Sequence, residues 1–103
     1  MTNIINVGFR ERKQMYIVVN TQEQEKFFHD YTVFSVDDFG DYWEIGNASY
    51  SDDGEISAYF DTIENLTFKT PEDFADYIAG KKHDDCSVMD LNDFHKFIDM
   101  LEQ

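Results

Sequence analysis

The sequence is poor in several features that would otherwise assign it to a class. It holds one proline, one cysteine and five glycines that stand singly, and no stretch approaches the roughly 20 apolar residues that a membrane helix needs. A lone cysteine excludes an internal disulfide and fits a reducing compartment. Residues 1–14 also lack the apolar run of a secretory signal. We therefore expect a cytoplasmic protein without a membrane segment.

The chain lacks a linker as well. It contains no internal repeat and no stretch rich in Gly, Ser or Pro, while 42% of its 103 residues are hydrophobic and 17% are aromatic. That apolar content is sufficient for a core, whereas disordered acidic chains are poor in aromatic residues. We predict that residues 1–103 form a single folded domain.

No segment has the spacing of a catalytic or metal-binding motif. Single glycines exclude a phosphate loop. If Gly54 is placed at the sixth position of a calcium loop, Ser49 falls at the first position and Phe60 at the last. Neither residue is the calcium ligand that the loop requires at that position. His83 and Cys86 have metal-ligand spacing, but structural zinc needs four ligands and no second pair is present. We therefore predict that the protein is not an enzyme and holds no cofactor or metal.

Alternating apolar residues predict a mostly antiparallel sheet of about five strands. The segment 5–20 is typical of a hairpin with charged residues 10–13 at its turn. The Ser-Asp-Asp-Gly sequence at 51–54 is typical of a turn that closes another hairpin. The β-branched and aromatic residues of strands occur at 31–36, 41–50, 55–63 and 66–70.

Three helices are expected around this sheet. Thr21 can cap a short helix within 20–31. Thr70 and Pro71 begin a second helix, which Gly80 and the two lysines after it would end. Residues 90–103 carry an apolar stripe at helical spacing. We expect an α+β fold in which the two C-terminal helices cover one face of the sheet.

Positive charge is missing from the middle of the chain. The 22 acidic and 8 basic residues give a net charge of −14, beyond the magnitude of about 2–8 that suits a small soluble domain. Between Lys26 and Lys69 there are ten acidic residues and no Lys or Arg. Such segregation steers cationic partners. An acidic proteome in a salt-adapted host is the alternative explanation of this composition.

The predicted partner-binding surface combines these acids with aromatic side chains. Carboxylates at alternate positions of a strand repeat about every 7 Å on one face, a spacing suited to imitating phosphates. Tyrosine and tryptophan would add anchoring contacts, although a solvated charged face and a core tryptophan are the alternative interpretations. The predicted residues are Asp37, Asp38, Asp41, Tyr42, Trp43, Glu44, Tyr50, Asp52, Asp53, Glu55, Tyr59 and Asp61.

These observations favour a small acidic inhibitor that binds the basic surface of a nucleic-acid-handling enzyme. Phage and mobile-element DNA mimics, such as anti-CRISPR and anti-restriction proteins, have this general profile. Direct nucleic-acid binding is disfavoured because the only cationic run lies at 10–13. The alternatives are an immunity protein or antitoxin that neutralises a nuclease toxin, and a small structural interaction subunit. We expect a monomer or a simple homodimer.

Overall fold

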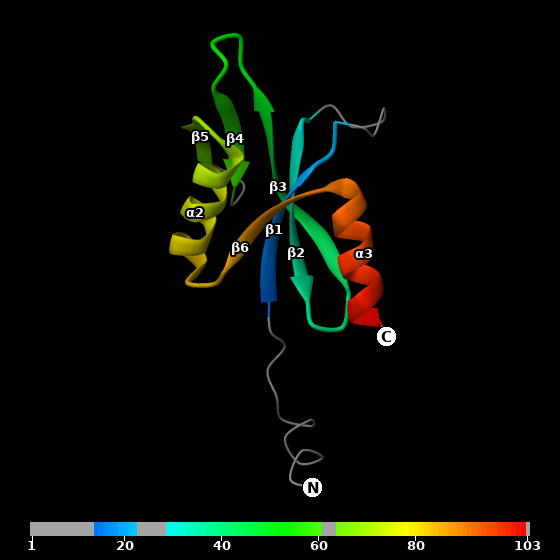
Figure 1. The fold of residues 1–103 in the computed structure, drawn as a ribbon. Coiled ribbons are helices and arrows are strands. Elements are labelled where there is room, and N and C mark those ends of the chain that lie inside the picture. The colour runs from blue at the N-terminus through cyan, green and yellow to red at the C-terminus, as the bar shows by residue number, and fades with distance from the viewer. Residues whose placement is uncertain (1–13, 23–28, 61–63, 103) are drawn as a thin grey trace, which may run out of the picture.

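The computed structural model describes residues 14–22, 29–60 and 64–102. They form an α+β fold in which one six-stranded sheet, in the order β5-β4-β3-β2-β1-β6, carries two helices (Figure 1). No helix among these residues is long and apolar enough to cross a membrane. The elements are β1 (Gln14–Asn20), β2 (Tyr31–Asp37), β3 (Tyr42–Tyr50), β4 (Ile56–Phe60), β5 (Glu64–Phe68), α2 (Pro71–Lys82), β6 (Cys86–Asp90) and α3 (Leu91–Glu102).

The first five strands form an antiparallel meander, each paired with its neighbours in the chain. This confirms the strands predicted at 31–36, 41–50, 55–63 and 66–70. The second half of the hairpin predicted at 5–20 is β1, and the first half lies outside the described residues. The centre of the short helix predicted within 20–31 lies outside them too. The hydroxyl of Thr21, its predicted cap, lies 3.2 Å from the carbonyl oxygen of His29.

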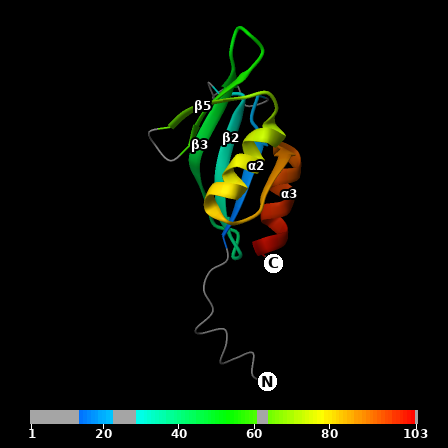
Figure 2. The ribbon, with the colours of Figure 1, turned by 90° about the vertical axis from the view of Figure 1, so that its left-hand side faces the viewer.

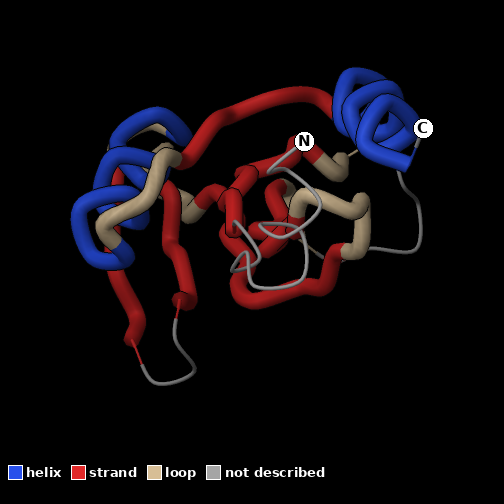
Figure 3. The backbone as a smooth tube through the Cα atoms, turned by 90° about the horizontal axis from the view of Figure 1, so that it is seen from below, coloured by secondary structure: helices blue, strands red, loops and turns tan. Residues whose placement is uncertain are grey.

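The sixth strand, β6 (Cys86–Asp90), is not among the strands predicted from the sequence. It pairs in parallel with β1, from Tyr16 opposite Cys86 to Asn20 opposite Asp90. The sheet is therefore mixed. A parallel pair needs a long crossover between its strands, and α2 supplies the last part of it. Figure 3 shows β6 running from the end of α2 to the start of α3.

The two helices lie on opposite faces of the sheet, so the expectation that both cover one face is wrong. Val18 of β1 packs in the same cluster as Phe74 of α2, whereas Ile17 and Val19 pack with Phe94 of α3. Successive side chains of a strand point to opposite faces. Figure 2 shows α2 across one side of the sheet. Because β6 is an edge strand, the chain can pass from one face to the other along it.

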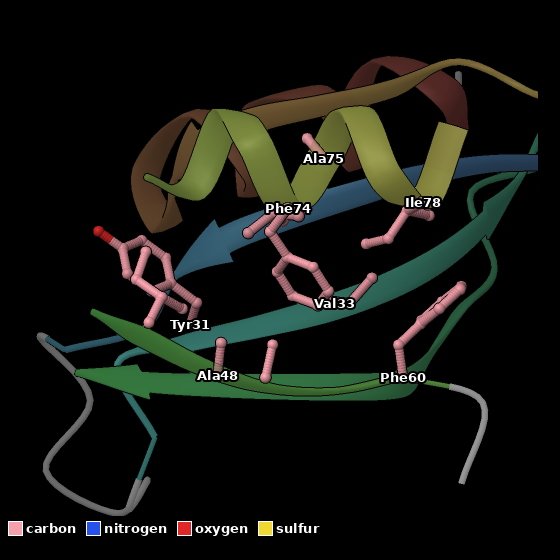
Figure 4. Close-up of a cluster of buried hydrophobic side chains, with 10 residues drawn as sticks. Tyr31, Val33, Ala48, Phe60, Phe74, Ala75 and Ile78 are labelled. Atoms are coloured by element: carbon pink, nitrogen blue, oxygen red, sulfur yellow. The ribbon is translucent and has the colours of Figure 1, made fainter. Parts of the chain in front are cut away.

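The larger core lies between α2 and the sheet (Figure 4). Phe60, Phe74 and Ile78 are fully buried there. The predicted start of α2 is confirmed, since the Thr70 side chain accepts a hydrogen bond from the Asp73 N–H at 3.1 Å. Its predicted end is confirmed, since the helix ends at Lys82 with both lysines in its last turn. Gly80 lies within the helix, and the residue that follows the helix in the left-handed conformation is His83 (φ 59°).

Candidate partner-binding surface

The turn between β2 and β3 is held together by Asp37, which the sequence had placed on the binding surface. Asp37 is fully buried. Its Oδ1 accepts the N–H of Phe39 at 2.9 Å and that of Asp41 at 3.1 Å. Gly40 allows this turn because it adopts a φ of 92°. The Asp37 carboxylate is thus occupied by its own backbone, and we leave it out of the candidate surface.

Aromatic side chains surround this turn. Phe39 is 53% exposed and was missed by the sequence analysis, which treated its segment as charge alone. Tyr42 stands edge-on to both Phe34, at 5.4 Å between ring centroids, and Phe94, at 5.1 Å. Trp43 is 48% exposed, so it is not the core residue of the alternative interpretation. Tyr42 is thus a supported ring with one accessible side, a suitable geometry for an anchoring contact.

A second acidic group lies at the tip of the β3–β4 hairpin, here called the hairpin tip (Ser51–Glu55). The Ser51 N–H donates to the Glu55 carbonyl oxygen at 2.7 Å, and the Gly54 N–H donates to that of Ser51 at 3.0 Å. Gly54 has a φ of 81°, which confirms the predicted turn. The three carboxylates of the hairpin tip, on Asp52, Asp53 and Glu55, are all exposed. They project from a tightly hydrogen-bonded turn.

The predicted row of carboxylates along one strand is not formed among the described residues. Of the acids predicted for the surface, only Asp37 and Glu44 lie within strands, and the others that the structure describes lie in the two turns. The two turns occupy opposite ends of β3 (Figure 1). β3 has nine residues, so the two groups lie about 26 Å apart at 3.3 Å per residue. Asp61 lies outside the described residues.

Two further tyrosines predicted for the surface are exposed on opposite faces of the sheet. Tyr59 is 48% exposed, between the buried Ala58 and Phe60. Tyr50 is 47% exposed, and its hydroxyl lies 3.0 Å from that of Tyr31. Burial raises the pKa of the Tyr31 phenol above its usual range, and the hydrogen bond with Tyr50 raises it further. The Tyr31 hydroxyl therefore stays protonated near neutral pH.

Acids distant in sequence lie at the same end of the sheet as the β2–β3 turn, in a group here called the acidic base (Asp38, Asp41, Asp84, Asp85 and Glu102). Gln14 of β1 pairs with Asp37 and lines the same cavity as Asp84 and Asp85. A Cβ placed on Gly40 would lie 2.8 Å from Cγ of Glu102. Both helices direct their C-terminal ends toward this end of the molecule (Figure 1), where the helix dipole adds partial negative charge.

The acidic base could not be found from sequence spacing, because its members come from three separate segments. No local pattern links residues 38–41 with residues 84–85 or with Glu102. Only the pairing of β6 with β1 and the packing of α3 against the turn bring them together. Among the described residues, no group of three or more His, Cys, Asp or Glu has the geometry to hold a metal ion.

Cys86 lies in β6, where burial raises the pKa of its thiol to about 12. The folded protein therefore keeps this proton between about pH 9 and 12, where an unfolded chain has lost it, so this group makes stability fall as pH rises through that window.

We expect iodoacetamide to alkylate Cys86 about 10- to 100-fold more slowly at pH 8 in the folded protein than in the denatured chain. Mass spectrometry would measure both rates. Equal rates would contradict the burial of the thiol.

Comparisons with known proteins give no relative from which a function could be transferred. No family model, no curated protein and no solved structure matches this chain.

Proposed function

We propose that this protein is a small acidic inhibitor that binds and blocks a nucleic-acid-handling enzyme by covering a basic surface of that enzyme. The observation that carries this proposal is the position of the exposed carboxylates. They form two groups, Asp52, Asp53 and Glu55 at the hairpin tip and Asp41, Asp84, Asp85 and Glu102 of the acidic base, with exposed aromatic rings beside them. Asp38 of the acidic base is half-buried, with its Oδ1 shielded from solvent. Strands β2 to β5 contain no Lys or Arg.

The separation of the two groups fits a partner with an extended basic surface. Enzymes that handle nucleic acids carry rows of Lys and Arg along the path of the phosphate backbone. Two acidic groups about 26 Å apart can contact such a path at two points along it. The anti-CRISPR and anti-restriction classes, in which an inhibitor acts as a DNA mimic, are the specific form of this proposal. Electrostatic attraction would also speed the encounter.

The proposal is tested by capture followed by an inhibition assay. Tagged full-length protein is incubated with lysates of bacterial hosts, bound proteins are eluted by a salt gradient, and each captured enzyme is purified and assayed for cleavage of its nucleic acid. We expect stoichiometric inhibition that weakens with salt, because salt screens exposed charges beyond a Debye length of about 8 Å. Capture of a single nuclease toxin would instead identify the immunity-protein alternative.

Matched variants separate charge from shape at the hairpin tip. Changing Asp52 and Asp53 to Asn and Glu55 to Gln removes three exposed charges and keeps side-chain size. We expect the inhibitory affinity to fall about tenfold, at 0.3–1 kcal/mol per exposed charge. The control is Asp76→Asn on the exposed side of α2. If capture resists salt and the hairpin-tip variant binds with the same affinity as the Asp76 variant, the inhibitor proposal would be rejected and a structural subunit favoured.

A further inference from the structure

A cavity of about 270 Å³ lies beside the first residues of β1 and β6. Its apolar side is formed by Met15 and Ile17 of β1, Met89 of β6 and Phe97 of α3. Asp84, Asp85 and Ser87 also line it, together with Gln14 and Tyr16. Among the described residues that line it there is no Lys, Arg or His. The cavity thus joins an apolar surface to a negatively charged rim.

The backbone around this cavity is fixed by the fold. β1 and β6 are paired from Tyr16 opposite Cys86 onward, and the Tyr16 N–H lies 3.4 Å from the carbonyl oxygen of Asp85. The hydroxyl of Ser35 donates to Oε1 of Gln14 at 2.7 Å, which holds that side chain. A ligand would therefore meet a largely preformed site and would lose little binding energy to ordering it.

We propose that this cavity receives the side chain of an arginine from the partner protein. Sites for drug-sized ligands usually measure about 300–1,000 Å³, so the present volume suits a single side chain. Arginine has an apolar stem that can lie against Met89 and Phe97 and a charged head that can remain at a polar rim. Its planar guanidinium carries five donors, which matches a rim of two carboxylates and a hydroxyl better than a lysine ammonium does.

The negative potential at the rim has two sources. Asp84 and Asp85 are both exposed and follow directly after His83, which ends α2. The C-terminal end of α2 adds the partial negative charge of its terminal carbonyl groups. Both lysines of the last turn lie near aromatic rings: Nζ of Lys81 lies 5.8 Å from the ring centroid of Tyr77, and Nζ of Lys82 lies 5.4 Å from that of Phe60.

This inference rests on the proposed function for the identity of the partner, but the site itself is tested without that partner. Full-length ¹⁵N-labelled protein is titrated with a Gly-Arg-Gly peptide and with matched peptides that carry lysine or citrulline. We expect the amide signals of Ser87, Met89 and Phe97 to shift on titration with the arginine peptide. We expect the neutral citrulline peptide to bind at least about tenfold more weakly, since it lacks the charge-assisted hydrogen bonds.

A pair of variants assigns the binding to the rim. Changing Asp84 and Asp85 to Asn is expected to weaken binding of the arginine peptide about tenfold. The same change at Asp52 and Asp53 of the hairpin tip removes as much net charge at a distance, and we expect an effect within about twofold because salt screens it. The ¹⁵N spectra verify that each variant is folded.

Several results would overturn the arginine site. They are shifts confined to other residues, equal binding of the citrulline peptide, equal binding of the lysine peptide, and unchanged affinity of the Asp84/Asp85 variant. Such a result, combined with salt-sensitive inhibition of a captured enzyme, would rule out the arginine site and still support the proposed function. Binding of the arginine peptide without any captured enzyme would support the site and remove the proposed function.

Discussion

Replacement of Phe94 by alanine is expected to lower the free energy of unfolding by about 3–5 kcal/mol. Phe94 is 1% exposed and stacks on Phe34 with 4.8 Å between ring centroids and 14° between ring planes. Tyr42 contacts the Phe94 ring edge-on. The substitution removes buried apolar surface and leaves a cavity between α3 and the sheet. Chemical denaturation followed by circular dichroism measures the change.

The matched control for this substitution is Met100→Ala, which shortens a residue of the same helix that is 69% exposed. We expect its effect to stay within about 0.5 kcal/mol. A loss below about 1 kcal/mol for Phe94→Ala would contradict the packing of α3 described here. Because Phe94 also supports the ring of Tyr42, its replacement should weaken partner binding even at temperatures where the protein stays folded.

The second large effect is expected for Asp37→Ala, which should lower the free energy of unfolding by about 2–4 kcal/mol. The buried carboxylate accepts two backbone N–H groups of the β2–β3 turn, from Phe39 and Asp41. Removing it leaves both donors without this acceptor. Asp37→Asn keeps an Oδ1 acceptor at the same position, so it should restore about half or more of the loss.

Thermal and urea denaturation of the Asp37 variants test this role. The control is Asp99→Ala, which removes an exposed carboxylate from α3 and should change stability by no more than about 0.5 kcal/mol. If Asp37→Ala is as stable as the wild type and instead loses partner binding, then Asp37 belongs to the binding surface as the sequence first indicated.

The elements predicted correctly are those with strong local signals. Thr70 and Pro71 predict the start of α2 because capping chemistry involves only neighbouring residues. The alternation of Ile56, Ala58 and Phe60 predicts the buried face of β4, and all three are fully buried.

The features missed depend on contacts between distant segments. Residues 86–90 contain only two apolar aliphatic side chains, Val88 and Met89, and become a strand because β1 offers them an open edge. The run of acids does not predict that Asp37 is buried, because its neighbours Asp38 and Asp41 carry the same charge and are more exposed. The sequence predicted that the acids matter as a group, but their division between two ends of β3 follows from the hairpin geometry.

The pairing of β6 with β1 has a consequence for how the chain reaches its native state. Tyr16 and Cys86 are partners across 86 − 16 = 70 positions, whereas β1 to β5 associate through successive neighbours. Closing such a long loop costs conformational entropy before any contact compensates for it. We therefore expect β6 and α3 to dock last. Until β6 docks, the edge of β1 stays open to a strand from another molecule. The docking of β6 and α3 is therefore both the folding step with the greatest risk of misassociation and the step that forms the acidic base.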